Sequence, residues 1–395
     1  MQLVRQVQLK HSKLLDHVTF LSKNLYNVAT YTVRQRFFKD RYWIRYYELW
    51  NVLKAHDAYQ ELQSTCGSHP PQQVLKQVDR NFKSFFNAMK QWRKYSSKFQ
   101  AMPRLPNYKR KNGHNVLYFT SLQCRVKNGA VLLTRKMESL GFPEIKMDLE
   151  RVKGVRIIPF GDRYNVELIY NHESQDLHLN EKNVMGIDLG LTNIVTASDN
   201  NGNAPLIIKG GVVKSINQFY NKQLAKYKSL SKKCNDTDMT RRILKLHRKR
   251  NNKVKDFFHK TSRAVINHCI IHDIGMVIIG YNERWKQNVN IGKKNNQNFV
   301  SIPFLTLVRQ IEYKAELIGV KVLRTTEEYT SQTCSLCGVI CKSNRKHRGL
   351  YVCKECGLVL NADVNAACNI IQKGVPKSIW RGDRGCLSRP VVLTI

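Results

Sequence analysis

Apolar residues alternate in short runs in some parts of the chain and recur at helical spacing in others. Val4 to Leu9 alternates and predicts an opening strand. Helical spacing then continues to about Lys98, and short alternating runs separated by turn residues follow from about 116 to 179. We therefore expect a helical domain at 11–100 and a small, partly closed β-barrel at 1–10 and 101–180.

The clearest helical stripe follows Pro70-Pro71, where a helix is expected to begin. Basic residues occupy the rest of that helix and predict a solvated face. The stripe consists of Val74, Leu75, Val78, Phe82, Phe85, Phe86 and Met89.

From Val184 onward, apolar strands alternate with helices, which predicts a mixed α/β sheet. The first of these strands ends in Asp188. The others expected are a hairpin partner at 194–197 and strands at 276–279 and 320–323; helices are expected at 216–260 (a basic pair), 262–272, 304–318 and 362–373. The predicted fold class is therefore α+β and multidomain.

The chain carries 66 Lys and Arg against 29 Asp and Glu, a net charge of +37. Self-repulsion on this scale makes a polyanion, and above all nucleic acid, the expected partner. We find no apolar run near the 18 residues that a spanning helix needs, so no membrane partner is expected. Phosphate contacts are predicted for eight cations of the basic helical pair: Arg241, Arg242, Lys245, Arg248, Lys249, Arg250, Lys253 and Lys255.

Two Cys-x-x-Cys pairs, Cys334/Cys337 and Cys353/Cys356, are separated by 15 residues. This spacing is typical of a zinc ribbon, in which two knuckles supply four thiolates to one structural Zn²⁺. Disulfides or idle thiols are the less favoured alternative. With eleven cysteines in the chain, metal ligation by four of them indicates a reducing compartment.

Carboxylates mark both ends of the predicted sheet region. Asp188 ends its first strand, and Asp363 lies in the first turn of a helix whose small residues allow close packing on a sheet. Convergent carboxylates are the ligands of a two-metal site for phosphodiester cleavage, and oxygen ligands suit Mg²⁺, with Mn²⁺ as a substitute. Each aspartate alone could equally be a turn residue or a helix cap.

Together these residues resemble the TnpB proteins of insertion sequences, their eukaryotic Fanzor relatives and the type V CRISPR nucleases. The resemblance covers nearly the whole chain. It rests on Gly186-Ile187-Asp188-Leu189-Gly190, Tyr329-Thr330-Ser331-Gln332-Thr333-Cys334, Cys353-x2-Cys356-Gly357 and Asp363-x-Asn365-Ala366-Ala367-x-Asn369, with further similarity at 73–86 and 103–109.

The resemblance implies a RuvC-type, RNase H-like nuclease at 181–330 and 359–373, with a helical insert near 214–262. A zinc ribbon at 331–358 and a basic tail at 374–395 complete this part. The helical domain would recognise nucleic acid, and the barrel would act as a wedge. The implied activity is Mg²⁺-dependent, RNA-guided cleavage of double-stranded DNA beside a short motif that the protein reads, with a guide RNA from the element's end.

The family usually places its middle catalytic glutamate directly after the second apolar strand, where this chain has Gly280. A subset of the family with glycine there resembles this chain, and it keeps a glutamate at the position of Glu327. We expect Glu327 to complete the set with Asp188 and Asp363. Glu328, Glu283 and the loss of a third ligand stay open as alternatives.

Two other functions remain open on these residues. Gly280 is compatible with an RNA-guided repressor that has lost cleavage, and the carboxylates alone would also fit a non-guided transposase accessory or resolvase. We expect a monomer, with a dimer as the alternative. The expected location is the cytoplasm and nucleoid in a bacterium, and the nucleus for a eukaryotic or viral host.

Overall fold

The computed structural model describes residues 1–147, 150–234, 239–282, 290, 292–347, 349–376 and 384–395. The chain forms two compact units, Met1–His172 and Glu173–Ile395. Each unit has a hydrophobic core of its own. None of the described helices has the length and apolar composition to cross a membrane.

Helices fill the first part of the N-terminal unit, as the apolar stripes predict. Ser12 caps the longest of them, since its Oγ accepts a hydrogen bond from Leu15 N at 3.2 Å. The stripe after Pro70-Pro71 is confirmed: its first four residues are buried, and Phe85, Phe86 and Met89 are half-buried. The helices are α1 (Lys13–Asp40), α2 (Tyr46–Leu53), α3 (Asp57–Cys66), α4 (His69–Lys94) and the short α5 (Arg135–Ser139).

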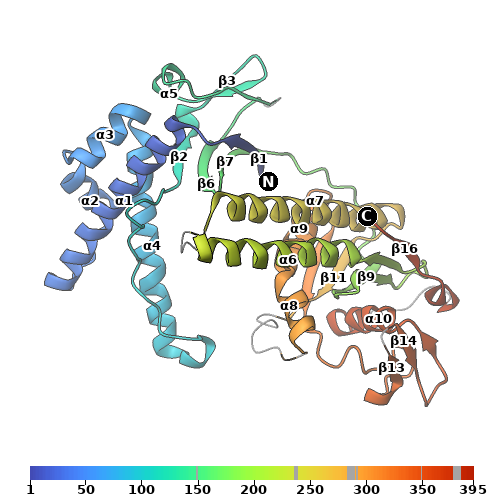
Figure 1. Ribbon diagram of the computed structural model, residues 1–395. Helices are drawn as coiled ribbons and strands as arrows, with labels where there is room; N and C mark the ends of the chain where they lie inside the picture. Colours follow the sequence, from blue (N-terminus) through green and yellow to red (C-terminus); the bar gives the residue numbers. More distant parts are fainter. Residues whose placement is uncertain (148–149, 235–238, 283–289, 291, 348, 377–383) are drawn as a thin grey trace. The chain divides into compact units, whose positions relative to one another are not determined.

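Two antiparallel sheets make up the remainder of this unit (Figure 1). The opening strand is confirmed and pairs along its whole length with β7, from Gln2↔Asn171 to Lys10↔Arg163. The partly closed barrel stays a prediction. The four-stranded sheet has the order β1 (Gln2–Lys10), β7 (Arg163–Asn171), β6 (Gly154–Phe160) and β2 (Leu117–Thr120); the other is β3 (Arg125–Lys127), β4 (Ala130–Leu132) and β5 (Ile145–Lys146).

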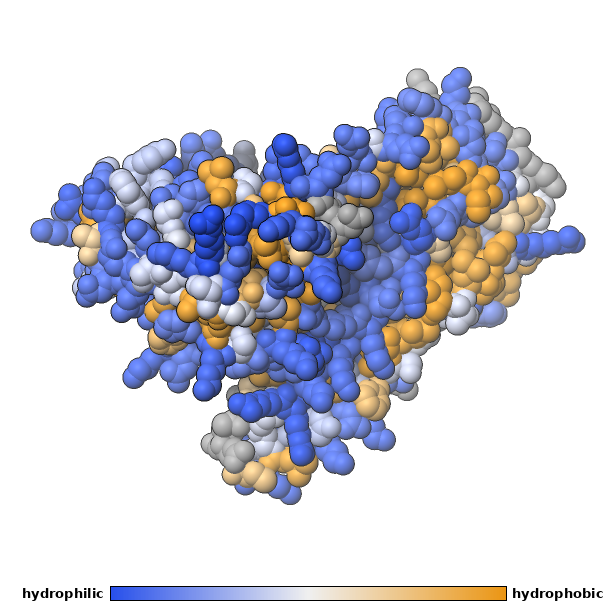
Figure 2. Space-filling view, turned by 90° about the horizontal axis from the view of Figure 1, so that it is seen from above, coloured by the Kyte–Doolittle hydropathy of each residue, from blue (hydrophilic) through white to orange (hydrophobic). Residues whose placement is uncertain are grey.

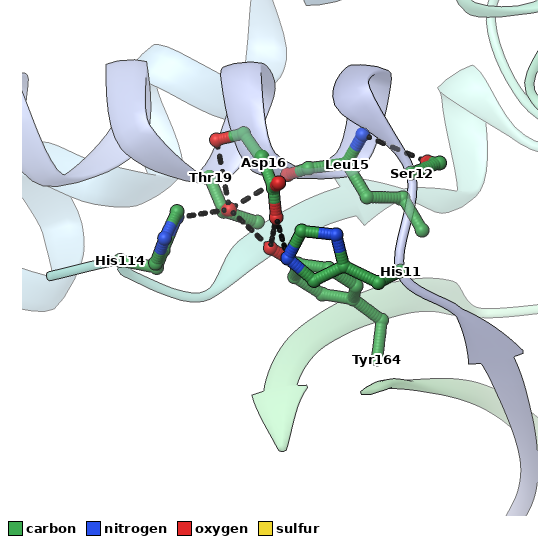
Figure 3. Close-up of polar contacts among 7 residues, drawn as sticks. All are labelled: His11, Ser12, Leu15, Asp16, Thr19, His114 and Tyr164. Atoms are coloured by element: carbon green, nitrogen blue, oxygen red, sulfur yellow. Dashed lines mark hydrogen bonds and ion pairs between the residues drawn. The ribbon is translucent and has the colours of Figure 1, made fainter. Parts of the chain in front are cut away.

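A polar network joins helix α1 to this sheet (Figure 3). Tyr164 of β7 donates its hydroxyl hydrogen to Asp16 Oδ1 at 2.5 Å, and His11 Nε2 lies 2.8 Å from the same oxygen. On the next turn, Thr19 Oγ1 is 2.9 Å from His114 Nδ1. Burial, followed by the hydrogen bond to Asp16, raises the pKa of Tyr164. The network therefore fixes the direction in which α1 leaves β1.

The C-terminal unit is built on a six-stranded mixed sheet, which confirms the predicted sheet class. β8 pairs in parallel with β11 and antiparallel with β9, and β11 pairs in parallel with β12. Strand order is β12 (Lys321–Thr325), β11 (Met276–Gly280), β8 (Val184–Asp188), β9 (Asn193–Asp199), β10 (Leu206–Lys209) and β16 (Val391–Leu393).

Helices cover both faces of this sheet. Alternate residues of β11 point to opposite faces: Val277 and Ile279 join the core formed with α7 and α9, whereas Ile278 packs on Ile370 and Ile371 of α10. The helices of this unit are α6 (Gly211–Cys234), α7 (Arg241–Ile271), α8 (Lys293–Ser301), α9 (Phe304–Glu316) and α10 (Ala362–Gly374).

Two details differ from the expected element boundaries. The predicted break between helices at 260–262 is wrong: α7 runs without interruption, and Ser262 Oγ bonds back to Phe258 O at 2.8 Å inside it. The segment at 391–393, expected only as part of a tail, is a sheet strand in register Leu206↔Val391.

Candidate active site and metal centre

The predicted carboxylates come from neighbouring elements at one edge of the sheet. β8 ends at Asp188, and the parallel strands β11 and β12 end at the same edge. Glu327 follows β12 by two residues. Asp363 lies in the first turn of α10, whose N-cap Asn361 accepts hydrogen bonds from Asp363 N and Val364 N.

Close packing brings α10 to this edge. An added Cβ on Gly186 would lie 2.2 Å from the carbonyl oxygen of Ala367. Glycine in β8 and alanine in α10 therefore let the two backbones meet, as the small residues predict. This contact places Asp363 beside Asp188.

The two aspartates and Glu327 interact electrostatically. Burial raises the pKa of Asp188 well above its ordinary value, and the charges of Glu327 and Asp363 raise it further, while Arg345 opposes them. Burial also raises the pKa of Glu327, to about 7. Like-charged groups at one place destabilise each other unless a proton or a cation separates them.

Glu327 occupies the space that a side chain at position 280 would need. A Cβ added to Gly280 would lie 2.8 Å from Glu327 Cγ and 3.0 Å from Glu327 Oε1. Glu328 is exposed, and Glu283 lies outside the described residues. Of the two candidate glutamates that the structure describes, it brings Glu327 to the end of β11.

The backbone around Glu327 is held by neighbouring polar groups. Asn282 Oδ1 accepts a hydrogen bond from Glu327 N at 3.0 Å, and Thr330 Oγ1 donates to Glu327 O at 2.9 Å. From α10, Asn369 Nδ2 donates to Thr330 O at 2.8 Å, and Asn365 Nδ2 donates to Thr333 O at 2.8 Å. Asn365 and Asn369, two and six residues after Asp363, therefore position the segment that follows Glu327.

Two residues at the site were missed by the sequence reasoning. Asn193 of β9 donates from Nδ2 to Asp363 Oδ2 at 2.8 Å. Arg345, in strand β13 (Arg345–His347), places Nη2 3.3 Å from Asp363 Oδ1. The cysteine spacing placed Arg345 inside a ribbon, and nothing in its local sequence shows that the ribbon faces the carboxylates.

One buried oxygen atom at the site lacks a hydrogen-bond partner among the described residues. Glu327 Oε1 is buried and has no hydrogen-bond partner in the described parts of the chain. The three carboxylates are not packed into one set of ligand atoms within 4.8 Å, a limit that the four cysteines do meet. Ligands spread around two ions about 3.5–4 Å apart need not satisfy that limit.

The four predicted cysteines lie together and could hold a zinc ion. Their Sγ atoms are within 4.8 Å of one another, with Cys334–Cys356 and Cys337–Cys353 both at 3.6 Å. Zn–S bonds of about 2.3 Å in a tetrahedron put sulfurs roughly 3.8 Å apart, so the geometry fits. Both knuckles turn through a glycine at positive φ, 78° for Gly338 and 71° for Gly357.

We expect purified protein to contain one zinc per chain, measured by metal analysis. Cys356→Ser should lower the zinc content and the melting temperature, because a three-thiolate site binds zinc weakly. Cys341→Ser is the matched control: Cys341 lies between the knuckles but bonds Ser343 Oγ at 3.2 Å and is not among the four. Equal zinc content in the two variants would contradict the assignment.

The eight basic residues of the helical pair lie on α7, which packs against α6 (Figure 1). Hydrophilic residues dominate the face drawn in Figure 2. Six of the eight are exposed and Arg248 is half-buried. Arg250 is also half-buried and makes hydrogen bonds within the unit: its Nε donates to Asn217 Oδ1 at 2.8 Å and its Nη2 to Ser301 O, joining α6, α7 and α8. The phosphate contacts of the eight residues stay a prediction.

Two family profiles match this unit. One, described as "Cas12f1-like, TNB domain", matches 304–370, and the other, described as "Probable transposase", matches 167–286. Their matches include Asp188, Glu327, Asp363 and the four cysteines. Both profiles thus fall on the sheet and ribbon that form the candidate site.

Three curated relatives agree with these family matches. The chain is 27% identical over 324 residues to the putative RNA-guided DNA endonuclease InsQ of Escherichia coli, covering 78% of this chain and 74% of InsQ. It is 29% identical over 228 residues to Cas12f1 of Sulfoacidibacillus thermotolerans, covering 55% and 52%. A TnpB-like protein of Acanthamoeba polyphaga mimivirus is 26% identical, covering 49% and 38%. The chain thus matches about half the length of the Cas12f1 relative.

Among solved structures, the mini-RNA-guided endonuclease CRISPR-Cas_phi3 aligns with a TM-score of 0.53 at 12% identity, covering 97% of this chain and 94% of that chain. This likeness concerns the fold. The chain is thus similar in fold to this endonuclease, and parts of it match the two family profiles. The predicted resemblance to TnpB-like RNA-guided nucleases is confirmed.

Proposed function

We propose that this chain is a transposon-associated, RNA-guided DNA endonuclease with an RNase H-like, RuvC-type nuclease core. The observation that carries the proposal is the geometry around Gly280. The last residue of β11, Gly280, lacks a side chain, and the carboxylate of Glu327 fills that space from the segment that follows the neighbouring parallel strand β12. A protein that had lost cleavage would have no need of that compensation.

In this proposal Asp188, Glu327 and Asp363 hold two Mg²⁺ ions. Bound there, the ions would activate water and stabilise the leaving oxygen of the scissile phosphodiester. The chain's own residues set the geometry: Asn193 holds Asp363 through Oδ2, and Asn282 holds the backbone of Glu327. The buried, unpartnered Oε1 of Glu327 supports a ligand role for this residue.

Arg345 supplies a positive charge at the same edge. Its guanidinium contacts Asp363 and lowers the pKa of Asp188 against the effects of burial and of the other carboxylates. With DNA bound, the same guanidinium is within reach of a phosphate near the carboxylates. We therefore assign the zinc ribbon at 331–358 two roles, carrying Arg345 and fixing the segment before α10.

The remaining assignments follow the domain division expected from the sequence. Residues 11–100 form the helical recognition domain, 1–10 and 101–180 a wedge-like barrel, and 181–330 with 359–373 the nuclease core. Of the basic tail expected at 374–395, strand β16 belongs to the sheet of that core. The partners would be an RNA from the element's end and double-stranded target DNA, and the relatives' names support both. The +37 charge and six exposed cations of α7 suit an RNA–DNA heteroduplex held through its phosphates.

The test is to purify the protein co-expressed with the DNA that flanks its gene, sequence the bound RNA and offer a plasmid library matching that RNA. We expect defined RNA and Mg²⁺-dependent cleavage beside a short common motif. Asp188→Ala should abolish cleavage and keep the RNA. Defined RNA without cleavage would favour a guided repressor, the alternative that Gly280 suggests, and absence of defined RNA would favour a non-guided nuclease.

Mg²⁺ should stabilise the protein more at pH 8 than at pH 6. A carboxylate whose folded pKa is raised contributes stability at low pH, and that stability is lost as pH rises through the folded value, about 7 for Glu327. Mg²⁺ replaces the lost protons, so its effect on melting temperature should grow across this range. In Glu327→Gln, the Mg²⁺-induced rise in melting temperature should depend less on pH. An equal rise at pH 6 and pH 8 in the unmodified protein would contradict the prediction.

A further inference from the structure

Helix α1 exposes three aromatic rings on a single face. Phe20, Tyr31 and Phe38 are 38%, 57% and 51% exposed. Spacings of 11 and 7 residues place them on one side of a helix with 3.6 residues per turn, over about 27 Å. The opposite side of α1 is buried in the core of the N-terminal unit. Large rings exposed in a row mark an interaction surface.

Cations lie against these rings. Lys23 Nζ is 3.7 Å from the centre of the Phe20 ring. Arg34 Cζ is 5.9 Å from the Phe38 ring and 5.0 Å from the ring of Tyr108, which is itself 44% exposed. No acidic residue occurs in the sequence between Asp16 and Asp40. The α1 face, defined as Phe20, Tyr31, Arg34, Phe38 and Tyr108, therefore combines flat exposed rings with the positive charge of Arg34.

Hydrogen bonds fix the segment that carries Tyr108 along α1. Asn27 Nδ2 donates to Lys109 O at 3.0 Å, and Asn27 Oδ1 accepts from Lys109 N at 2.8 Å. Lys23 is buried beneath the ring of Phe20, and its Nζ donates to Lys111 O at 2.9 Å. The α1 face is thus formed before any partner binds, which lowers the entropic cost of binding.

We propose that the α1 face is a base-stacking surface for unpaired nucleotides of the RNA partner. Every base has a flat face that stacks on exposed aromatic rings, while Arg34, which lies beside the rings of Phe38 and Tyr108, contacts a phosphate. A duplex keeps its bases stacked inside and could use only this cation. That the partner is an RNA rests on the proposed function. The preference for single strands over duplexes rests on the exposed rings alone.

The test uses the full-length protein and short oligouridine, followed by fluorescence anisotropy, with an RNA duplex of the same length as the comparison. The triple variant Phe20→Ala/Tyr31→Ala/Phe38→Ala keeps every charge. Each lost stack should weaken oligouridine binding roughly 5- to 150-fold, with duplex binding and the salt dependence unchanged. Tyr47→Ala removes a ring that is 78% exposed on α2, and it should bind as the unmodified protein does.

Two further measurements keep the proposal falsifiable. Phe38→Trp should retain binding, and oligouridine carrying 5-iodouracil should crosslink to α1 or to Tyr108. Equal losses for single strand and duplex, an unchanged affinity, or a change of oligomeric state in the triple variant would overturn the stacking surface. Guided plasmid cleavage, measured separately on Asp188→Ala, tests the proposed function, because that variant should lose cleavage and still bind oligouridine.

Discussion

Glu327→Ala is expected to reduce DNA cleavage by at least about 100-fold while RNA binding persists. Loss of a group that only orients a metal ligand already costs 10–100-fold, and Glu327 is placed as a ligand itself. The measurement is the single-turnover cleavage rate of a matching plasmid at saturating Mg²⁺. Glu328→Ala is the matched control, since its side chain is exposed and lies one residue further along the same segment.

Moving the carboxylate back to position 280 should restore part of the lost activity. A Cβ on Gly280 meets Glu327 Cγ at 2.8 Å and Ile370 Cδ1 at 2.6 Å. Glu327→Ala removes the first obstacle, and the second is the end of a flexible side chain. Gly280→Glu/Glu327→Ala should therefore cleave faster than Glu327→Ala. Gly280→Glu alone should be impaired, because two carboxylates would compete for one space.

A different outcome would change the interpretation of this site. If Glu327→Ala cleaves normally, the third ligand lies elsewhere, and Glu283, outside the described residues, becomes the next candidate. If the double variant stays inactive although it folds and binds RNA, position 280 and Glu327 do not serve the same metal. Either result would show that Glu327 lies in the space beside Gly280 without replacing a metal ligand from that position.

Asp188, Asp363 and the cysteines were predictable because each carries its own local pattern. A carboxylate after an apolar strand, a carboxylate in the first turn of a small-residue helix and paired Cys-x-x-Cys knuckles are all short-range signals. Glu327 and Glu328 both follow an apolar strand, and only the family resemblance favoured Glu327. Its place depends on β11 and β12 being parallel neighbours in register Gly280↔Thr325, which no local pattern encodes.

The positions of the two site residues that the sequence did not predict also depend on tertiary structure. Asn193 reaches Asp363 from β9 across 170 positions of sequence, and Arg345 reaches it from the ribbon. Strand β16 was missed for a similar reason, since three apolar residues become a strand only beside β10. Conversely, Arg250 resembles its basic neighbours in sequence, and its hydrogen bonds to Asn217 and Ser301 are visible only in the structure.

Gly186→Ala should destabilise the C-terminal unit and abolish cleavage together. Its new methyl group would lie 2.2 Å from Ala367 O and 2.8 Å from Ile371 Cγ1. The first obstacle is backbone, so α10 itself must move, and it carries Asp363 away from Asp188. Overpacking of this kind costs about 2 kcal/mol or more, or roughly 4–8 °C in melting temperature for a unit of this size.

Gly211→Ala provides the control for the same chemical change. Gly211 begins α6, and an added Cβ there would meet nothing within 4 Å. That variant should keep its melting temperature, and alanine at a helical position favours the helix. Normal cleavage by Gly186→Ala would show that α10 does not sit as closely on β8 as described. Lost cleavage with an unchanged melting temperature would mean that the site depends on a displacement of Asp363 too small to affect stability.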